Sequence, residues 1–320
     1  MQEIKKQPVI NKRNPNSHKG NYGRVFIVAG SPGMTGAAYM CGKSALRSGA
    51  GLVTVGIPES LNPVMEVKLT CVMTLPLPET PSGTIAGAAK IKIQNFSEQC
   101  DVIVIGPGLS QHPETRALVI DLIKEVKIPI VLDADGLNAI QGELSLLKNI
   151  NQDIILTPHP GELARLMNRT SSDIQCNRRD VAEEFITTVK QHNINETCDK
   201  EKDIVLVLKG NKTVVINHSN IYINNTGNPG MASGGSGDVL SGIIGALIAQ
   251  GFTPFSASQL AVYIHGRAGD LAAKQKGETS MIATDIIDYL SNVFIELTTA
   301  ETALSGMQSM KGGSNKKNKK

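Results

Sequence analysis

Aromatic residues are scarce in this chain of 320 residues: they make up 3% of it, and tryptophan is absent. With so few aromatic side chains there is no stacking platform for nucleic-acid bases. The excess of basic charge is also small, because the formal net charge is +3 and five lysines lie in the last ten residues, KGGSNKKNKK. We therefore expect no nucleic-acid partner.

Long hydrophobic runs and cysteine motifs are missing as well. The longest apolar-rich stretch, residues 239–252, is shorter than the roughly 20 residues that span a bilayer. The N-terminal segment lacks the apolar centre of a signal peptide, and the five cysteines are odd in number and never form CxxC. We therefore expect a cytoplasmic protein with no membrane segment, no disulfide framework and no zinc site.

Short β-branched runs alternate with longer segments of helical periodicity. Continuous apolar runs are typical of strands buried on both faces, and such alternation indicates a mainly parallel sheet. The expected strands are 25–29, 52–57, 102–105, 130–132, 154–156 and 204–208, with a hairpin over 213–217 and 221–224. The expected helices are 37–47, 114–127, 177–190 and 256–274, the last within a helical block over 236–297.

These elements predict an α/β fold with a mainly parallel central sheet flanked by helices on both faces. No linker or internal repeat divides the chain, so we expect one domain over residues 15–299. Residues 300–320 are polar with lysines at the end and are predicted to be a disordered tail. Residues 193–203 are predicted to form a solvated loop.

The most informative motif is a glycine-rich element, NNTGNPGMASGGSGDVLSGIIGALIAQG, over residues 224–251. Its glycines permit positive φ and close approach to a ligand, and the amides of Gly235, Ser236 and Gly237 predict an anion hole at a helix N-terminus. Asp238 follows in the first turn, where the helix dipole favours its ionised form and suits it to act as a base. The alternative is a capped helix after a flexible loop, because Ser236 and Asp238 are both good capping residues.

Further polar loops follow the expected strands. They are IGPGLS (105–110), VLDADGLNAI (131–140) and ILTPHPGELARL (155–166). Ligands of open parallel sheets bind at the carboxyl ends of strands, so these loops and Asp238 are expected to converge. Asp133 and Asp135 either orient a hydroxyl or hydrated cation or cap a turn, and His159 is placed to touch a ligand. Lys209 either faces a phosphate or is a solvated edge lysine.

Four other active-site patterns are not supported. AAYMCGKS (37–44) matches a relaxed P-loop, but its apolar periodicity continues as a helix, which leaves no free N–H groups around a phosphate. GPGLSQ is a fragment of the dinucleotide fingerprint without its last glycine. No GxSxG nucleophile motif is present, and the six histidines show no metal-ligand spacing.

Taken together and in order, the motifs closely resemble the ADP-dependent NAD(P)H-hydrate dehydratase family of the ribokinase-like superfamily. They are HKGNYGRVFIVAGSPGMTGAA, ALRSGAGLVTV, VIGPGL, VLDADGLNA, LTPHPGE, LKG and GSGDVLSGIIGALIAQG, over residues 18–251. The resemblance implies dehydration of the S epimer of NADH or NADPH hydrate, coupled to hydrolysis of ADP or ATP. It implies substrate contacts at Ala38, Gly108, His159 and Asp238, and nucleotide contacts at Lys209, Gly210, Asn211, Lys212, Thr213 and Gly237.

The expected mechanism uses Asp238 to take the proton of the ring hydroxyl while the amides of residues 235–237 hold the transferring phosphoryl group. Mg²⁺ is expected, with Asp133, Asp135 and Glu162 as candidates to organise it directly or through water. Relatives are commonly tetrameric, and many carry an epimerase domain, which we expect here on another polypeptide. The alternatives are a ribokinase-like kinase of hydroxyethylthiazole or hydroxymethylpyrimidine type and a catalytically silent nucleotide sensor.

Overall fold

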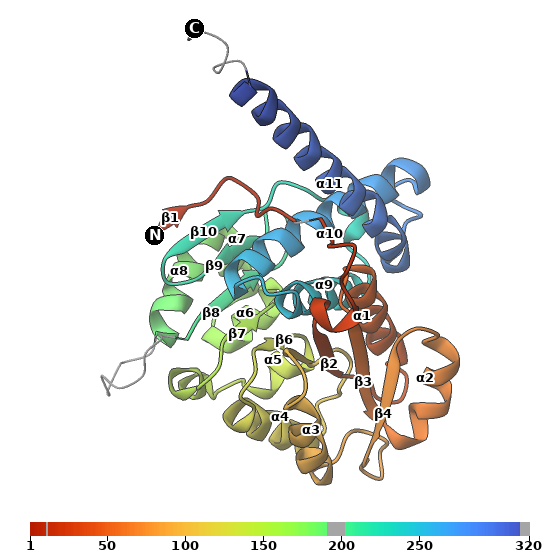
Figure 1. The fold of residues 1–320 in the computed structure, drawn as a ribbon. Helices are drawn as coiled ribbons and strands as arrows, with labels where there is room; N and C mark the ends of the chain where they lie inside the picture. Colours follow the sequence, from red (N-terminus) through yellow and green to blue (C-terminus); the bar gives the residue numbers. More distant parts are fainter. Residues whose placement is uncertain (11, 191–201, 314–320) are drawn as a thin grey trace, which may run out of the picture.

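The computed structural model describes residues 1–10, 12–190 and 202–313, with side chains described as far as residue 298. Within these residues one ten-stranded sheet has the order β1-β10-β9-β8-β7-β6-β5-β2-β3-β4 (Figure 1). The strands are β1 (Gln2–Glu3), β2 (Arg24–Val28), β3 (Leu52–Pro58), β4 (Met73–Leu77), β5 (Val102–Ile105), β6 (Ile130–Leu132), β7 (Ile154–Leu156), β8 (Ile204–Leu208), β9 (Val214–Ile216) and β10 (Asn220–Ile223).

The sheet is parallel from β4 to β8, and β9 runs antiparallel to both of its neighbours. The six predicted strands and the predicted hairpin are confirmed to within one or two residues at each end. Two strands were not predicted, β1 and β4. In β4, Pro76 interrupts the apolar pattern, and the strand is tolerated because it lies at the edge of the sheet.

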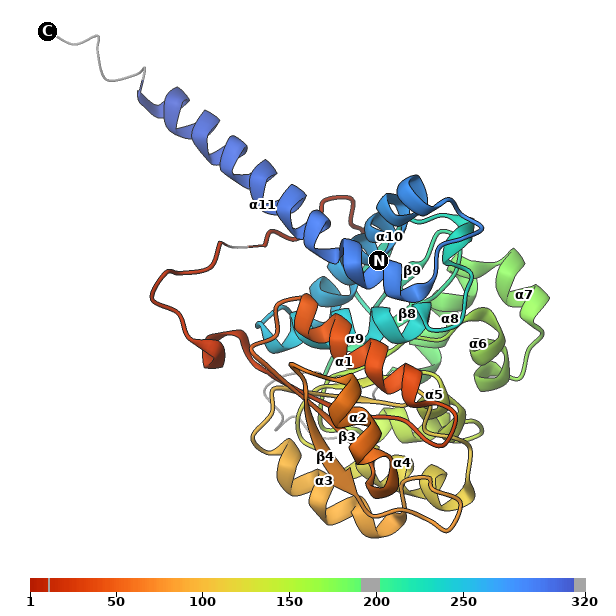
Figure 2. The ribbon, with the colours of Figure 1, turned by 90° about the vertical axis from the view of Figure 1, so that its right-hand side faces the viewer.

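Helices cover both faces of the sheet, as predicted (Figures 1 and 2). Alternate residues of each strand point to opposite faces, so Val25 and Ile27 of β2 pack with α1, α9, α10 and α11, while Phe26 and Val28 pack with α3, α4, α6 and α8. The helices are α1 (Thr35–Arg47), α2 (Asn62–Lys68), α3 (Lys90–Ser97), α4 (Pro113–Glu125), α5 (Asp135–Ala139), α6 (Pro160–Met167), α7 (Ser171–Cys176), α8 (Arg178–Val189), α9 (Ser236–Ala249), α10 (Pro254–Lys276) and α11 (Ala283–Gly313).

Helix α9 lies close against the middle of the sheet and against α1, because two of its three glycines, Gly245 and Gly242, face these neighbours. A Cβ on Gly245 would lie 2.8 Å from a methyl carbon of Val104 in β5, and a Cβ on Gly242 would lie 2.2 Å from the Cys41 carbonyl oxygen in α1. Neither position has room for a larger residue. The close packing fixes the N-terminus of α9 relative to the loops at the sheet edge.

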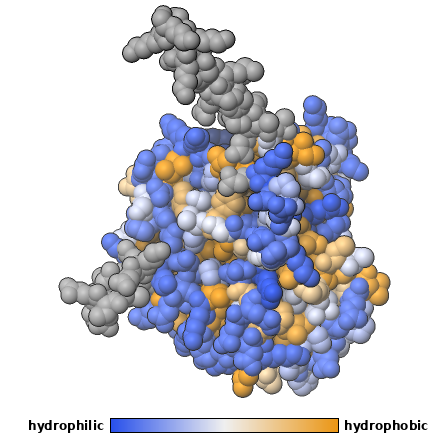
Figure 3. Space-filling view, in the orientation of Figure 1, coloured by the Kyte–Doolittle hydropathy of each residue, from blue (hydrophilic) through white to orange (hydrophobic). Residues whose placement is uncertain are grey.

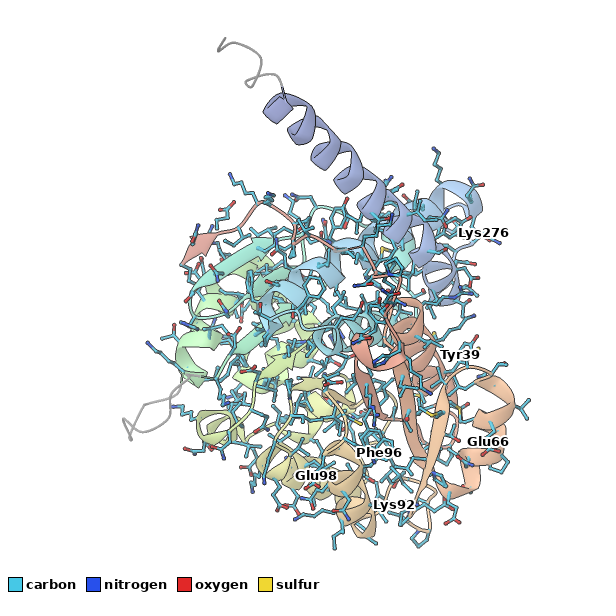
Figure 4. The ribbon with its side chains drawn as sticks, viewed as in Figure 1. Tyr39, Glu66, Lys92, Phe96, Glu98 and Lys276 are labelled. Carbon is cyan, nitrogen blue, oxygen red and sulfur yellow. The ribbon has the colours of Figure 1, made fainter. Side chains whose placement is uncertain are left out.

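The surface shows no continuous apolar face on the side drawn in Figure 3, where hydrophobic side chains are scattered among hydrophilic ones. At the β4 edge, Tyr39 of α1 lies near α2 (Figure 4), and the ammonium groups of Lys43 and Lys68 lie 5.4 and 5.3 Å from its ring centre. Among the described residues, no helix combines the length and the apolar character needed to cross a membrane.

Helix α11 continues to Gly313, so the boundary predicted at residue 299 falls inside a helix. The segment ETALSGMQSM consists largely of good helix formers, which the tail prediction undervalued beside its polarity. Residues 314–320 of the predicted tail and residues 193–201 of the predicted loop lie outside the described residues. The domain limits therefore stay a prediction.

Candidate active site

The candidate site lies at the edge where the parallel strands β2, β5, β6, β7 and β8 end. A Cβ on Gly237 at the start of α9 would lie 3.1 Å from Lys209 Nζ and 3.8 Å from Asp133 Oδ2. The glycine-rich element therefore meets the strand loops, as predicted for a ligand site at the carboxyl ends of strands. Of the predicted residues, Gly108 follows β5, Asp133 and Asp135 follow β6, His159 and Glu162 follow β7, and Lys209 follows β8.

The glycine-rich segment enters α9 through a turn that only glycine fits. Gly235 has φ of 94°, and a Cβ there would lie 2.3 Å from Met40 Cε. The Ser236 N–H donates to the Ser233 carbonyl at 3.4 Å, whereas the N–H groups of Gly235 and Gly237 have no acceptor in the described part of the chain. Of the three amides of the predicted anion hole, two are thus free to face an anion.

A buried ion pair lies beside the N-terminus of α9. Lys209 Nζ donates to Asp133 Oδ1 at 2.7 Å, and Ser241 Oγ donates to Asp133 Oδ2, also at 2.7 Å. Burial by itself would raise the pKa of Asp133, but the Lys209 ammonium and these hydrogen bonds outweigh it and lower that pKa. Burial opposes the charge of Lys209 as well, yet the carboxylates of Asp133 and Glu162 raise its pKa. Both groups are therefore charged at neutral pH.

Asp238 is a partly buried carboxyl group in the first turn of α9. Burial and the negative charge of Asp133 raise its pKa to about 7, with smaller contributions from Asp135 and Glu162, and Lys209 opposes the shift. The sequence-based expectation that the helix dipole keeps this carboxyl ionised is therefore incomplete, because burial among carboxylates dominates. A carboxyl group with a pKa near neutrality is well suited to proton transfer.

His159 caps helix α6 instead of projecting freely toward a ligand. Its Nδ1 accepts hydrogen bonds from the N–H groups of Gly161 at 3.0 Å and Glu162 at 3.3 Å. The Glu162 carboxylate accepts from the His159 N–H at 2.7 Å and lies 3.5 Å from Nε2. Burial lowers the pKa of His159, so the ring is neutral at pH 7 and carries its proton on Nε2. Glu162 also lies 3.8 Å from Lys209 Nζ, which joins this cap to the ion pair.

The predicted substrate residues Ala38 and Gly108 belong to two segments that touch each other. Gly108 has φ of 63°, its carbonyl accepts from Ser31 Oγ at 2.8 Å, and a Cβ on it would lie 2.8 Å from Met34 Cβ. Ala38 is fully buried in the first turn of α1 behind this loop. Its methyl group therefore faces the core.

The five residues from Lys209 to Thr213 that are predicted to bind the nucleotide do not form one continuous surface. Lys209 is 18% exposed and points into the carboxylate cluster. Gly210, Asn211 and Lys212 are exposed, in a turn between β8 and β9 that Thr213 closes with a hydrogen bond to the Gly210 carbonyl.

Two residues that support the site were not predicted. Ser241 lies one turn after Asp238 on α9, a spacing that the sequence displays and that could have indicated its contact with the site. Arg178 donates to the carbonyls of Leu208 and Lys209 at 2.7 and 3.1 Å and fixes the end of β8. It lies 31 residues from Lys209, and no local motif points to it.

The carboxylates proposed to organise Mg²⁺ do not form a ligand cluster. Asp133 is engaged by Lys209 and Ser241, and Asp135 accepts from the Ser110 N–H at 2.9 Å and from Asn138 at 3.2 Å. Among the described residues, no group of histidine, cysteine, aspartate and glutamate side chains could hold a metal ion. A direct Mg²⁺ site on these residues does not fit the structure, because they do not converge into a ligand cluster.

The P-loop alternative is excluded by the structure. Residues 37–44 lie within α1, which begins at Thr35, so their N–H groups are engaged in helical hydrogen bonds. The loop before this helix, with Gly30 and Gly33 at positive φ, lies against the loop after β5, where the Gly30 N–H donates to the Pro107 carbonyl at 2.9 Å.

Comparison with known proteins identifies the family. The sequence profile described as NAD(P)H-hydrate dehydratase matches residues 25–292. The bifunctional NAD(P)H-hydrate repair enzyme Nnr of Moorella thermoacetica is 43% identical over 287 residues, which are 89% of this chain and 52% of that enzyme. The chain thus spans about half the length of this relative.

Solved structures agree on the fold. The ADP/ATP-dependent NAD(P)H-hydrate dehydratase of Bacillus subtilis, co-crystallized with ATP and Mg²⁺, is 28% identical with a TM-score of 0.72, and the match covers 90% of this chain and 95% of that one. A ribokinase-like superfamily protein of Enterococcus faecalis is 26% identical with a TM-score of 0.74 over 90% and 92%. The predicted ribokinase-like fold is confirmed, and the chain belongs to the NAD(P)H-hydrate dehydratase family.

Proposed function

We propose that this protein dehydrates the S epimer of NADH or NADPH hydrate and couples the reaction to hydrolysis of ADP or ATP. Family membership and the ADP/ATP-dependent relative of B. subtilis support this assignment. The observation that carries it is the position of Asp238, a base with a pKa of about 7 beside the free amides of Gly235 and Gly237. Such a base next to an anion site suits phosphorylation of a hydroxyl group.

In the first step Asp238 accepts the proton of the ring hydroxyl. The hydroxyl oxygen attacks the terminal phosphorus of ADP or ATP and displaces AMP or ADP. The phosphate ester then breaks its C–O bond while the neighbouring ring carbon loses a proton to solvent, which restores the ring double bond and releases inorganic phosphate. This route replaces hydroxide, a poor leaving group, by phosphate, a good one.

The protein groups around Asp238 stabilise the transferring phosphoryl group. The amides of Gly235 and Gly237 supply two preorganised donors, and Lys209 Nζ lies next to Gly237. Because Asp133 holds Lys209 at 2.7 Å, the ammonium is fixed before the nucleotide arrives. We infer that Mg²⁺ enters with the nucleotide phosphates, whose charge it neutralises when bound.

Substrate and nucleotide approach from different loops in this proposal. Gly108, His159 and Asp238 would contact the hydrated nicotinamide nucleotide. The resemblance also implies a contact at Ala38, but this whole residue is buried behind the loop that carries Gly108. The exposed turn after Lys209, residues 210–213, and Gly237 would contact the adenine nucleotide. A separate epimerase supplying the S epimer, a homotetramer and a cytoplasmic location stay predictions.

The test is to incubate the purified protein with hydrated NADH, Mg²⁺ and ADP or ATP and to follow the absorbance of reduced nicotinamide. We expect NADH, inorganic phosphate and AMP or ADP in equal amounts. Asp238→Asn should bind the nucleotide but lower the rate by about 100-fold or more. Asp121→Asn, at an exposed ion pair with Lys90, is the matched control and should keep the rate.

Two results would contradict the proposal. A stable phosphate ester with no recovery of absorbance would identify a small-molecule kinase. Binding of nucleotide without its consumption in the presence of hydrate would identify a nucleotide sensor.

A further inference from the structure

The glycine-rich segment before α9 is hydrogen-bonded at both of its ends to side chains of the neighbouring helix α10. From Gly227 to Ser236 the chain could extend roughly 30 Å. Yet the tethers at its two ends are Asp270 and His265, five residues apart on α10, a rise of about 7.5 Å along the helix. The segment is therefore a closed loop fastened to α10.

The first tether is a carboxylate that accepts two hydrogen bonds. Asp270 Oδ2 accepts from the Gly227 N–H at 3.1 Å, and Oδ1 accepts from Asn228 Nδ2, also at 3.1 Å. The Asn228 Oδ1 in turn accepts from the Gly230 N–H at 3.0 Å. Donors and acceptors are therefore fully matched between α10 and the beginning of the loop.

The second tether lies where the loop becomes α9. Ser236 Oγ lies 3.2 Å from His265 Nε2, so α10 holds the residue between the two free amides of the anion site. The proposed base, Asp238, follows two residues later.

Two glycines of α10 let the loop approach closely between these tethers. A Cβ on Gly266 would lie 2.3 Å from Thr226 Oγ1, and a Cβ on Gly269 would lie 2.3 Å from Met231 Sδ. The four residues 265, 266, 269 and 270 lie on one side of the helix, because positions four apart face the same way. In the sequence HGRAGD, the histidine and the aspartate thus bind the loop, and the two glycines leave room for it.

We propose that Asp270 and His265 are positioning residues for the phosphate-binding amides of Gly235 and Gly237, through the loop that they fasten. The inference rests on the proposed function, since it takes the glycine-rich loop to be the site of the nucleotide phosphates. Neither residue touches the reacting atoms in this role. Gly230 and Gly235 also pack closely against Glu278 and Met40, but among the described residues the side-chain hydrogen bonds that join residues 227–236 to another element all go to α10. A loop with so many glycines needs such bonds to fix its amides to the accuracy that an anion site requires.

The matched donors and acceptors of the first tether allow a swap experiment. In Asp270→Asn, an amide NH₂ faces the NH₂ of Asn228, and in Asn228→Asp two carboxylates face each other. When both substitutions are combined, the side-chain hydrogen bond between positions 270 and 228 is restored with its direction reversed, while the Gly227 and Gly230 N–H groups keep acceptors. The double variant should therefore recover what each single variant loses.

The measurement is the dissociation constant for ADP and for ATP by calorimetry, together with the Michaelis constants for nucleotide and hydrate. We expect each single variant to bind nucleotide about tenfold more weakly with the Michaelis constant for hydrate unchanged, and the double variant to return to within about threefold of the parent. Arg267→Gln is the matched control, because it breaks a contact of α10 with Glu296 of α11 and does not face the loop.

Unfolding temperatures separate a local effect from loss of the fold, and Ser236→Ala tests the second tether if the swap variants unfold. The inference is overturned if the single variants bind nucleotide like the parent, or if the double variant binds no better than the weaker single one. If the parent binds ADP or ATP but restores no NADH, the proposed reaction fails while the tether test still stands. If the parent binds neither nucleotide, both fail.

Discussion

Replacing Asp238 by asparagine should stabilise the protein at alkaline pH while it lowers the rate by about 100-fold or more. Burial and the Asp133 carboxylate raise the pKa of Asp238 from its ordinary value of 3.8 to about 7. At about 1.4 kcal/mol per pH unit, this difference corresponds to about 4 kcal/mol of unfavourable free energy for the ionised side chain in the folded state. Asparagine has nearly the same shape and no charge, so it avoids that energy.

The sign of the effect defines a pH window. Below pH 4 the carboxyl group is protonated in both folded and unfolded states, so parent and variant differ little. Between pH 4 and about 7 the unfolded chain is ionised while the folded site still holds its proton, and the parent loses stability as the pH rises. Above about pH 7 the difference should level off at about 4 kcal/mol, an upper limit because Asp238 is partly exposed.

The assay is urea unfolding of parent and Asp238→Asn at pH 5, 6, 7, 8 and 9, with Asp121→Asn as the control. The free energy of unfolding of the Asp238 variant should exceed that of the parent by an amount that grows up to about pH 7. The control should differ by less than about 1 kcal/mol at every pH, because its ion pair is exposed. A difference that does not change with pH, or a variant less stable than the parent at pH 8, would refute the assignment of a raised pKa.

Three further predictions concern the surrounding groups. Lys209→Met should lower the free energy of unfolding by about 3–5 kcal/mol at pH 8, measured in urea, because it leaves the Asp133 carboxylate buried without a cation, and by less at pH 5, where that carboxyl group can take a proton. Gly235→Ala should weaken ADP binding in calorimetry, because alanine is strained at φ of 94° and its methyl group meets Met40. The pH profile of kcat/KM should rise to a plateau with an apparent pKa of about 7, which belongs to the carboxylate cluster around Asp238, and a profile flat from pH 6 to 8 would argue against Asp238 as the base.

The sheet could be predicted from the sequence because its strands are continuous apolar runs buried on both faces. Runs such as Ile130–Leu132 and Ile204–Leu208 carry that signal in their own residues. The strand Met73–Leu77 does not, because its hydrogen bonds depend on β3 and its proline is acceptable only at an edge. Edge strands are defined by their neighbours more than by their composition.

The loops that form the site could be predicted from the sequence, but the electrostatic interactions among its charged residues could not. The motifs predicted that the loop with Asp133 and the residue Asp238 converge, but they left Lys209 open between a phosphate contact and a solvated edge. No local pattern shows that Lys209 reaches a carboxylate 76 residues away. The pKa of Asp238 depends on the distances among these groups and on burial, which only the fold sets. The same limit explains why His265 and Asp270 were missed, since their partners lie 29 and 43 residues earlier in the chain.

The charges of the site also connect nucleotide binding to the strength of the base. Asp133, Asp135 and Glu162 already raise the pKa of Asp238, and Lys209 is the cation that opposes them. A nucleotide phosphate held at the Gly235 and Gly237 amides brings negative charge close to Asp238, and the part of that charge that Mg²⁺ does not neutralise raises the pKa of this carboxyl group further. The ionised carboxylate is then a stronger base toward the hydroxyl proton, while a smaller fraction of Asp238 is ionised at pH 7. The bound nucleotide therefore strengthens the base at the same time as it supplies the phosphoryl group. This disfavours proton abstraction from the substrate hydroxyl before the nucleotide is bound.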